Sequence, residues 1–443
     1  MENYHVSENC VPARIFRLCD NRNSDIMIGM EIMSKQIEQQ NQNNILECIE
    51  QAGEISRAGV AKQLGLSRTT VSSAVARLLE AGLVCEADQA DPSQSRGHPG
   101  IPLALTTDIW YAAGAALIDS EMLFVLTDLR GHIVDRLAVP VPDGTSDAFL
   151  RALSDGFQTI IVRCPGRLLP MLGVGSPGMI NHGRILWASD MGWENIPISN
   201  HLMDTRGLPS TVVNRHWASC LSEYHFGVGK GIQSLIYVGI STGIAASIIL
   251  DGKLFTGAYH NAGEIGHTVV NRNGPRCSCG RRGCLHAIAS ELALRKHVSE
   301  YYIAHPGPAA VPDPLWATVQ AGDQPDIHSI CRAAAAGHPV ALSELQTAAL
   351  YLGLSISNLT SMFNPQCVIV GGSLIDHGGK LLTDLIIDSV RAHGSADTLD
   401  AVEIRPWSLG RYSGALGAAR LVLDQKRTLA TAVMPTEDKT GPA

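Results

Sequence analysis

Residues 262–284 read AGEIGHTVVNRNGPRCSCGRRGC. Three thiols, Cys277, Cys279 and Cys284, lie within eight residues of one another, and His267 precedes the first of them by ten. A glycine-rich loop of this kind can fold its sulfur atoms around one tetrahedral Zn²⁺, with the histidine as the fourth ligand. Because Cys3His is a closed ligand set, we expect one structural Zn²⁺ per chain, held by His267, Cys277, Cys279 and Cys284.

Two other interpretations of these cysteines stay open, namely incidental core residues and a redox pair. The flanking glycines and arginines make a core position a poor fit. The whole chain has 11 cysteines in 443 residues, which is too dilute for a disulfide scaffold. The other eight cysteines have no assigned role.

Around this loop, short β-branched segments alternate with helical patterns from about residue 108 onward, which predicts an α/β architecture. We expect an N-terminal arm at 1–40 and a winged helix-turn-helix domain at 41–107. A first α/β lobe should span 108–215, and a C-terminal helix at about 406–430 should return to it. A second lobe should span 216–405 and contain the cysteine loop at 267–284.

The segment from Asn44 to about Cys85 carries apolar residues at spacings of three and four, which predicts three short amphipathic helices. Ser56 and Ser67 are suited to cap two of them, and Gly65 allows a tight turn between these two. No carboxylate lies between Ser67 and Leu79. A helix that enters the DNA major groove needs such a face, with hydroxyls and arginines toward base edges and phosphates.

We therefore expect the helix at 67–80 to read DNA, with the glycine- and proline-rich stretch 91–100 as the tip of a wing. The candidate DNA-binding residues share exposed hydroxyl, guanidinium or imidazole groups: Arg57, Ser67, Arg68, Thr69, Thr70, Ser72, Ser73, Arg77, Arg96 and His98. The alternative is a generic three-helix packing module with a solvated polar face.

Charge and hydropathy limit which partners and which cellular location the chain can have. The chain has 34 Lys and Arg against 42 Asp and Glu, a net charge of −8, which argues against a general polyanion binder. DNA affinity must then come from one helix face, the wing and association into a homodimer or homotetramer. No apolar run reaches the ~20 residues of a membrane-spanning helix, and no signal peptide is recognisable, so we expect a cytoplasmic protein.

The chain resembles the transcriptional regulators of the ROK family, which groups repressors, open reading frames and sugar kinases. The resemblance spans roughly residues 44–425, and its strongest marker is the stretch from Ala262 to Cys284. Further matches are Gly175-Ser-Pro-Gly178, Gly192-Trp193, Ser241-Thr-Gly243, Asp251-Gly252, Val370-Gly-Gly372 and Gly414-Ala-Leu-Gly-Ala-Ala419. The helix-turn-helix segment is similar to the repressor branch of the family, because its kinases lack that domain.

This resemblance implies an actin-like or hexokinase-like fold of two α/β lobes with a sugar cleft between them. Family members typically bind sugar through the Glu and His of the Glu-Ile-Gly-His sequence, here Glu264 and His267. The histidine would hold sugar with one ring nitrogen and zinc with the other. The implied ligand-binding residues are Gly178, Asp190, Asn214, Arg215, Glu264, His267 and His286.

Two departures from the family pattern argue against kinase activity. Where the kinases have the phosphate loop Asp-x-Gly-Gly-Thr, this chain reads Leu117-Ile-Asp-Ser-Glu-Met122. Where they have Asn-Asp, with the aspartate as general base, the chain has Asn214-Arg215, and arginine cannot act as a base at neutral pH. We expect no enzymatic activity and no catalytic residues. A sugar kinase with residual ATP-dependent activity remains the alternative.

Two further departures lie in the implied sugar pocket. Asp190 stands where Asn is usual, and His286 stands where the signature ends in Glu. Together with Arg215, they suggest an anionic effector, such as a sugar phosphate or an acidic sugar, because arginine suits phosphate and carboxylate. The sequence thus predicts a sugar-responsive repressor of carbohydrate uptake or catabolism genes that binds double-stranded operator DNA. A pocket that binds nothing, or control by a protein partner, remains open.

Overall fold

The computed structural model describes residues 22–87, 101–141, 144–306, 313–394 and 402–424. Their contacts divide the chain into two compact units, one up to Ala104 and one from Leu105 onward. In the described part of the chain, no helix combines the length and the apolar character that crossing a membrane would need.

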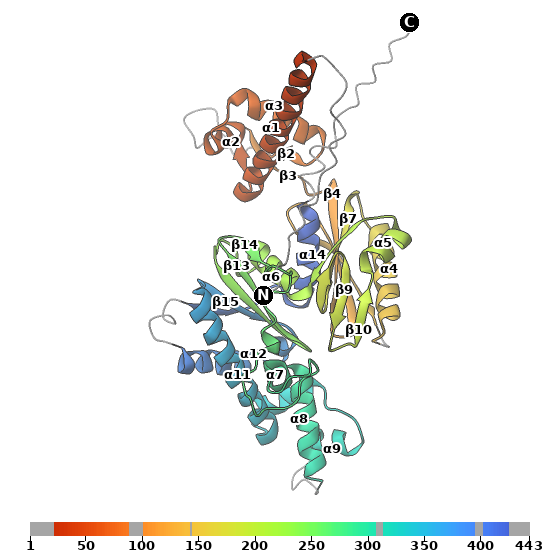
Figure 1. Ribbon diagram of the computed structural model, residues 1–443, viewed down its shortest axis with the longest axis vertical. Helices are drawn as coiled ribbons and strands as arrows, with labels where there is room; N and C mark the ends of the chain where they lie inside the picture. The colour runs from red at the N-terminus through yellow and green to blue at the C-terminus, as the bar shows by residue number, and fades with distance from the viewer. Residues whose placement is uncertain (1–21, 88–100, 142–143, 307–312, 395–401, 425–443) are drawn as a thin grey trace, which may run out of the picture. The chain divides into compact units, whose positions relative to one another are not determined.

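The N-terminal unit is a helical bundle beside a small sheet (Figure 1). Its elements are α1 (Arg22–Ala52), β1 (Ile55–Ser56), α2 (Arg57–Leu64), α3 (Arg68–Glu80), β2 (Val84–Glu86) and β3 (Pro102–Leu105). The strand order is β1-β3-β2, so β2 and β3 form the wing. Fully buried apolar side chains join the three helices: Ile45, Leu46, Ile49, Val60, Val71, Val75 and Leu78.

Local capping sets the helix-turn-helix as the sequence predicts. The Ser56 hydroxyl accepts a hydrogen bond from the Gly59 N–H at 3.1 Å, and the Ser67 hydroxyl accepts one from the Thr70 N–H at 3.1 Å. Gly65 ends α2 in the left-handed region with φ 65°. A residue with a β-carbon would be strained there, so glycine makes the tight turn between the two helices possible.

From Arg22 onward, the N-terminal arm expected at 1–40 is helical, because α1 begins there. The polar Gln/Asn stretch continues the helix that Ile45, Leu46 and Ile49 anchor in the core. Once such a helix is nucleated, each added residue gains a hydrogen bond without a new nucleation cost. Residues 1–21 lie outside the described part of the chain.

The first sheet of the C-terminal unit has five strands in the order β11-β7-β4-β5-β6. They are β4 (Trp110–Ile118), β5 (Glu121–Thr127), β6 (Ile133–Pro140), β7 (Arg167–Ser176) and β11 (Ser210–Asn214). Strand β5 pairs antiparallel with both β4 and β6, whereas β7 pairs parallel with both β4 and β11. Helices α4 (Ser146–Val162) and α5 (Ile198–Arg206) belong to the same lobe.

Helix α14 (Ser413–Leu423) packs directly on β4 and β7. Gly114 and Gly173 are paired across these two strands. A β-carbon on Gly173 would lie 2.1 Å from the Ala418 carbonyl oxygen, and one on Gly114 would lie 2.2 Å from that of Ala415. The two glycines therefore let the helix backbone rest on the sheet, and α4 covers the opposite face (Figure 1).

Three short strands, β8 (Met179–Asn181), β9 (Arg184–Ala188) and β10 (Trp193–Ile196), form a separate sheet in the order β10-β9-β8. None of these strands is predicted from the sequence. Strands of three to five residues that join through tight turns are too short to show a period. The turn between β9 and β10 carries Asp190.

The second lobe is built on a sheet in the order β14-β13-β12-β15-β16. Its strands are β12 (Leu235–Ile240), β13 (Ile244–Leu250), β14 (Lys253–Phe255), β15 (Cys367–Gly371) and β16 (Glu403–Pro406). Its helices are η2 (Ile265–His267), α7 (Leu285–Ala289), α8 (Glu291–Ala304), α9 (Pro314–Gln320), α10 (Ile327–Ala335), α11 (Pro339–Phe363) and α12 (Ser373–His393).

Alternation along β12 divides the core of this lobe. Ile236, Val238 and Ile240 pack toward α8, α10, α11 and α12, whereas Leu235 and Tyr237 face α6 (Arg215–Phe226). Two segments connect the lobes: α6, which follows β11, and residues 407–412, which include η3 (Gly410–Tyr412) and lead from β16 into α14. The lobes therefore meet along α6 and α14, which contact each other.

Candidate functional site

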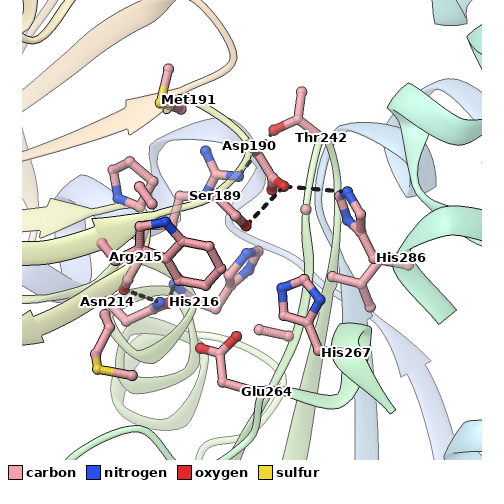
Figure 2. Close-up of a pocket in the computed structure, with 18 of the residues that line it drawn as sticks. Ser189, Asp190, Met191, Asn214, Arg215, His216, Thr242, Glu264, His267 and His286 are labelled. Atoms are coloured by element: carbon pink, nitrogen blue, oxygen red, sulfur yellow. Dashed lines mark hydrogen bonds and ion pairs between the residues drawn. The ribbon is translucent and has the colours of Figure 1, made fainter. Parts of the chain in front are cut away.

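A cavity of about 530 Å³ lies between the two sheets of the C-terminal unit. All seven implied ligand-binding residues line it: Gly178, Asp190, Asn214, Arg215, Glu264, His267 and His286. They come from loops of the first lobe, from the start of α6, and from η2 and α7 of the second lobe (Figure 2). The volume lies within the usual range for small-molecule pockets, roughly 300–1,000 Å³.

Asp190 lies at the rim of this cavity on the β9–β10 turn. Its Oδ1 is 3.3 Å from His286 Nε2, and it accepts hydrogen bonds from the Ser189 hydroxyl at 3.3 Å and the Ser278 hydroxyl at 3.4 Å. Figure 2 shows the Asp190 carboxylate between Ser189 and His286. His286 and Ser278 belong to the second lobe, so Asp190 contacts side chains across the cavity.

Asn214 and Gly178 shape the first-lobe wall. The Asn214 side chain caps α6 by accepting a hydrogen bond from the His216 N–H at 2.8 Å, and its amide donates to the Gly178 carbonyl at 3.0 Å. Gly178 has φ 80°, and a β-carbon there would lie 2.4 Å from the Trp187 carbonyl oxygen. Both residues thus have a clear structural role beside their place in the cavity wall.

Arg215 is the first residue of α6 and is only 7% exposed. Its guanidinium donates to the Leu117 carbonyl at 3.3 Å, the Ser241 hydroxyl at 3.3 Å and the Thr242 hydroxyl at 3.1 Å. All three of these hydrogen-bond partners are neutral oxygens. Burial lowers the pKa of Arg215, while the more distant carboxylates, Asp119 first, raise it.

The imidazole of His216, also in the cavity lining, is uncharged. Burial, together with the neighbouring Arg215, lowers the pKa of His216 to about 3. The positive charge at this end of the cavity therefore resides on Arg215.

On the second-lobe side, Glu264 directly precedes the short helix η2 and His267 is its last residue (Figure 2). Desolvation within the cleft, and then the negative charge of Asp190, raises the pKa of Glu264. His267 Nδ1 lies 3.6 Å from Cys277 Sγ. Since His267 also lines the cavity, a single imidazole connects the cavity to the cysteine loop.

The four predicted metal ligands form one cluster. One ligand atom from each of His267, Cys277, Cys279 and Cys284 lies within 4.8 Å of all the others. Cys279 Sγ and Cys284 Sγ are 3.6 Å apart. A tetrahedral Zn²⁺ with Zn–S bonds of about 2.3 Å would hold its sulfur ligands about 3.8 Å apart. The donor set and its spacing therefore fit zinc.

Local charge and backbone geometry support this fit. Although burial raises it, hydrogen bonds from the Arg281 backbone and side chain lower the pKa of Cys279 to about 7, which favours the thiolate. Gly283 has φ 71°, and a β-carbon there would lie 1.5 Å from the Asn271 carbonyl oxygen. Only glycine fits at this point, where two arms of the loop touch.

The N-terminal unit brings some predicted DNA-binding residues together on α3 and pairs two of the arginines with carboxylates. Exposed side chains on or beside the start of α3 are Ser67, Arg68, Thr69, Ser72 and Ser73, and Thr70 is partly buried. Arg57 forms an ion pair with Glu86 of β2 at 2.7 Å, and Arg77 forms one with Glu38 of α1. These two arginines tie elements of the unit together. Arg96 and His98 lie outside the described residues.

Several cavity residues were absent from the predicted set. Asp119 lies on the β4–β5 turn with φ 53°, Thr242 on the β12–β13 turn, and Arg281 in the cysteine loop. The sequence carried a partial signal for each: turn-forming residues at 119–120, the Ser241-Thr-Gly243 match, and a glycine-flanked arginine. None of these indicates a cavity until the loops of two lobes are brought together.

Comparison with known proteins agrees with this architecture. The ROK family matches residues 119–425, and a family described as winged helix-turn-helix DNA-binding matches residues 39–84. The xylose repressor of Bacillus subtilis (strain 168) is 29% identical over 395 residues, which cover 87% of this chain and 95% of the repressor.

Two solved structures extend the comparison. A ROK family transcriptional regulator, described as a homolog of the E. coli MLC protein, matches with a TM-score of 0.74 at 26% identity, over 89% of this chain and 99% of that one. A ROK family glucokinase from Streptomyces griseus in complex with glucose and AMPPNP matches with a TM-score of 0.61 at 28% identity, over 70% of this chain and 98% of that one. With its family match covering residues 119–425, the chain belongs to the ROK family.

Proposed function

We propose that this protein is a sugar-responsive, DNA-binding transcriptional repressor of carbohydrate uptake or catabolism genes. The observation that carries the proposal is that one chain contains a winged helix-turn-helix unit and a two-lobed unit whose cavity is lined in part by charged side chains. The similar xylose repressor and regulator structure support it. A transcriptional repressor must have access to DNA, so we assign this protein to the cytoplasm.

In this proposal α3 reads the operator. Its exposed start presents Arg68, Thr69, Ser72 and Ser73, with Ser67 at the cap, which suits contacts to base edges and phosphates. The acidic net charge makes one copy a weak binder. A homodimer, or a homotetramer built from two such pairs, would place two α3 helices on a palindromic operator.

Phosphoryl transfer is not part of the proposed function. Arg215 occupies the position where a kinase of this family has its general base, and a guanidinium cannot accept a proton from a sugar hydroxyl at neutral pH. At the phosphate loop position, Glu121 forms an ion pair with Arg411. A carboxylate at that turn would repel nucleotide phosphates.

We propose that the effector carries an anionic group, a phosphate or a carboxylate, which binds at Arg215. The support is a buried guanidinium whose direct partners are all neutral oxygens, in the wall of a cavity. The Glu264 carboxylate would accept hydrogen bonds from the sugar hydroxyls, and the His267 ring would donate one to them. Arg281 adds a second cation to the lining.

We further propose that one Zn²⁺ per chain is bound by His267, Cys277, Cys279 and Cys284. The metal would act structurally: it would hold the loop 277–284 against η2 and fix the ring of His267 in the cavity wall. Atomic absorption should give one zinc per chain. Cys279→Ser should reduce this ratio, whereas Cys85→Ser, which lies outside the cluster, should not.

The experiment that tests the function combines binding with operator release. Purified protein is titrated with xylose, glucose, glucose 6-phosphate and glucuronate by calorimetry, and each binder is then added to the complex of protein and operator DNA. We expect glucose 6-phosphate or glucuronate to bind and to release DNA, and Arg215→Met to lose this preference. A neutral sugar that binds tighter than its anionic counterpart would refute the anionic effector. Failure of every sugar to release DNA would refute the function itself.

A further inference from the structure

The contacts of Asp190 differ from those of the other cavity residues because they extend to the cysteine loop of the opposite lobe. Ser278, the second-lobe hydroxyl that donates to Asp190, stands between the candidate metal ligands Cys277 and Cys279. His286, the other second-lobe partner, follows Cys284 by two residues on α7. The contacts of Asp190 therefore reach the segment that carries three of the four clustered ligands.

These contacts are weak, and they crowd one atom. The Ser189 hydroxyl, the Ser278 hydroxyl and the His286 ring all meet the same Oδ1 of Asp190, at 3.3, 3.4 and 3.3 Å. A carboxylate oxygen has two lone pairs, and hydroxyl donors prefer roughly 2.7–2.8 Å. A ligand hydroxyl at that preferred distance would bond this oxygen more strongly than either serine does.

We propose that Asp190 is a latch that an effector opens: without ligand it holds the cysteine loop and α7 to the first lobe through Ser278 and His286. The inference rests on the proposed function, since it specifies how occupancy of the same cavity is sensed. An effector hydroxyl that donates to Asp190 Oδ1 displaces Ser278 and frees the cysteine loop from the first lobe. The position of the loop then reports whether the cavity is filled.

The chain offers a matched control for this latch. The hydroxyls of Ser189 and Ser278 donate hydrogen bonds to the same atom, Asp190 Oδ1. Ser189, however, belongs to the first lobe and adjoins Asp190 in sequence. Ser189→Ala removes a contact within one lobe, and Ser278→Ala removes a contact between lobes. Each substitution removes one serine hydroxyl, so the two variants differ only in the lobe from which the lost hydrogen bond came.

The test is amide hydrogen exchange of the full-length, zinc-loaded protein without any sugar. Loss of one net hydrogen bond changes a local opening equilibrium by a small factor, so we expect Ser278→Ala to speed exchange in residues 271–283 about 2- to 5-fold. Ser189→Ala should leave exchange in this segment at the wild-type rate. Asp190→Ala should match or exceed Ser278→Ala, whereas Asp190→Asn, which keeps an acceptor oxygen, should have a smaller effect.

Equal exchange of the 271–283 segment in wild type and Ser278→Ala would overturn the latch, as would an equal acceleration by Ser189→Ala. The sugar panel described above gives a separate readout: a sugar that binds the wild type should speed exchange of the same segment, and should add little in Ser278→Ala. The latch can fail while sugars still release the operator. The repressor function can fail while the ligand-free exchange pattern still holds.

Discussion

The carboxylate of Glu223 stabilises the connection between the two lobes of the C-terminal unit. Glu223 is fully buried, and its two oxygens accept hydrogen bonds from the N–H groups of Val228, Ser408 and Leu409 and from the Ser408 hydroxyl, at 2.8–3.1 Å. Val228 follows α6, and Ser408 lies in the segment that returns to the first lobe. One side chain therefore joins both connections between the lobes.

We predict that Glu223→Gln lowers the free energy of unfolding of the C-terminal unit by about 2–4 kcal/mol, because an amide NH2 would replace an acceptor that faces donors. Urea unfolding followed by near-UV circular dichroism measures this. The control is Glu300→Gln, an exposed partner of Lys296, which should change it by less than about 0.5 kcal/mol. Equal effects of the two substitutions would contradict the assigned role of Glu223.

Asp313 gives a prediction for the dependence of stability on pH. Although burial raises it, hydrogen bonds from the Tyr302 hydroxyl and the Trp316 N–H lower the pKa of Asp313 below its ordinary value of 3.8. Because the folded-state pKa is lower than the unfolded one, this carboxylate stabilises the fold above about pH 4, and that contribution is lost as the pH falls through the folded pKa.

Asp313→Asn should therefore lower the thermal unfolding midpoint by a constant amount above pH 5. The difference from wild type should shrink as the pH falls below about 4. Thermal unfolding between pH 2 and pH 7 measures both. A difference that persists unchanged at pH 2 would show that the carboxylate charge contributes nothing.

At the scale of elements, the contact between α14 and the first sheet depends on two glycines. We predict that Gly173→Ala lowers the free energy of unfolding by about 2–4 kcal/mol, since its β-carbon would meet the helix backbone at 2.1 Å. Gly175→Ala on the same strand meets its nearest neighbour, the Ala116 β-carbon, at 3.2 Å and should cost less than about 1 kcal/mol. The reverse order would show that α14 does not rest on the sheet as described.

Helix α3 carries the prediction for DNA binding. Ser72→Asp puts a carboxylate on its exposed face, and repulsion by phosphates should weaken operator affinity at least about 10-fold at low salt. Ser343→Asp, on an exposed position of α11, should leave operator affinity unchanged. Fluorescence anisotropy with labelled operator DNA distinguishes the two. If Ser72→Asp binds as tightly as wild type, α3 does not read the DNA.

At the scale of the whole molecule, the proposed binding to a palindromic operator requires a symmetric pair of chains. If two copies each supply one α3 helix, a single half-site should bind at least about 10-fold more weakly than the full palindrome, and the complex should contain two chains or a multiple of two. Analytical ultracentrifugation with labelled DNA reports both quantities. One chain on a full operator would refute the paired arrangement.

The local elements were predictable from the sequence where one short segment contains the whole signal. The caps at Ser56 and Ser67, the turn at Gly65 and the cysteine cluster all depend on residues close along the chain. The strands β8–β10 and the first half of α1 were not predictable. The former are too short to show a period, and the latter is a polar segment that extends a helix anchored further along the chain.

The sequence by itself determined the class of protein: a helix-turn-helix unit, two α/β lobes and a candidate set of metal ligands. Only the tertiary structure decided which side chains meet. It pairs Arg57 with Glu86 and Arg77 with Glu38, and it places Asp190 against Ser278 and His286. The physical reason is the separation along the chain over which each kind of interaction acts. Capping and ligand spacing act over a few residues, whereas ion pairs and cavity contacts join positions tens of residues apart, which meet only when the lobes have folded.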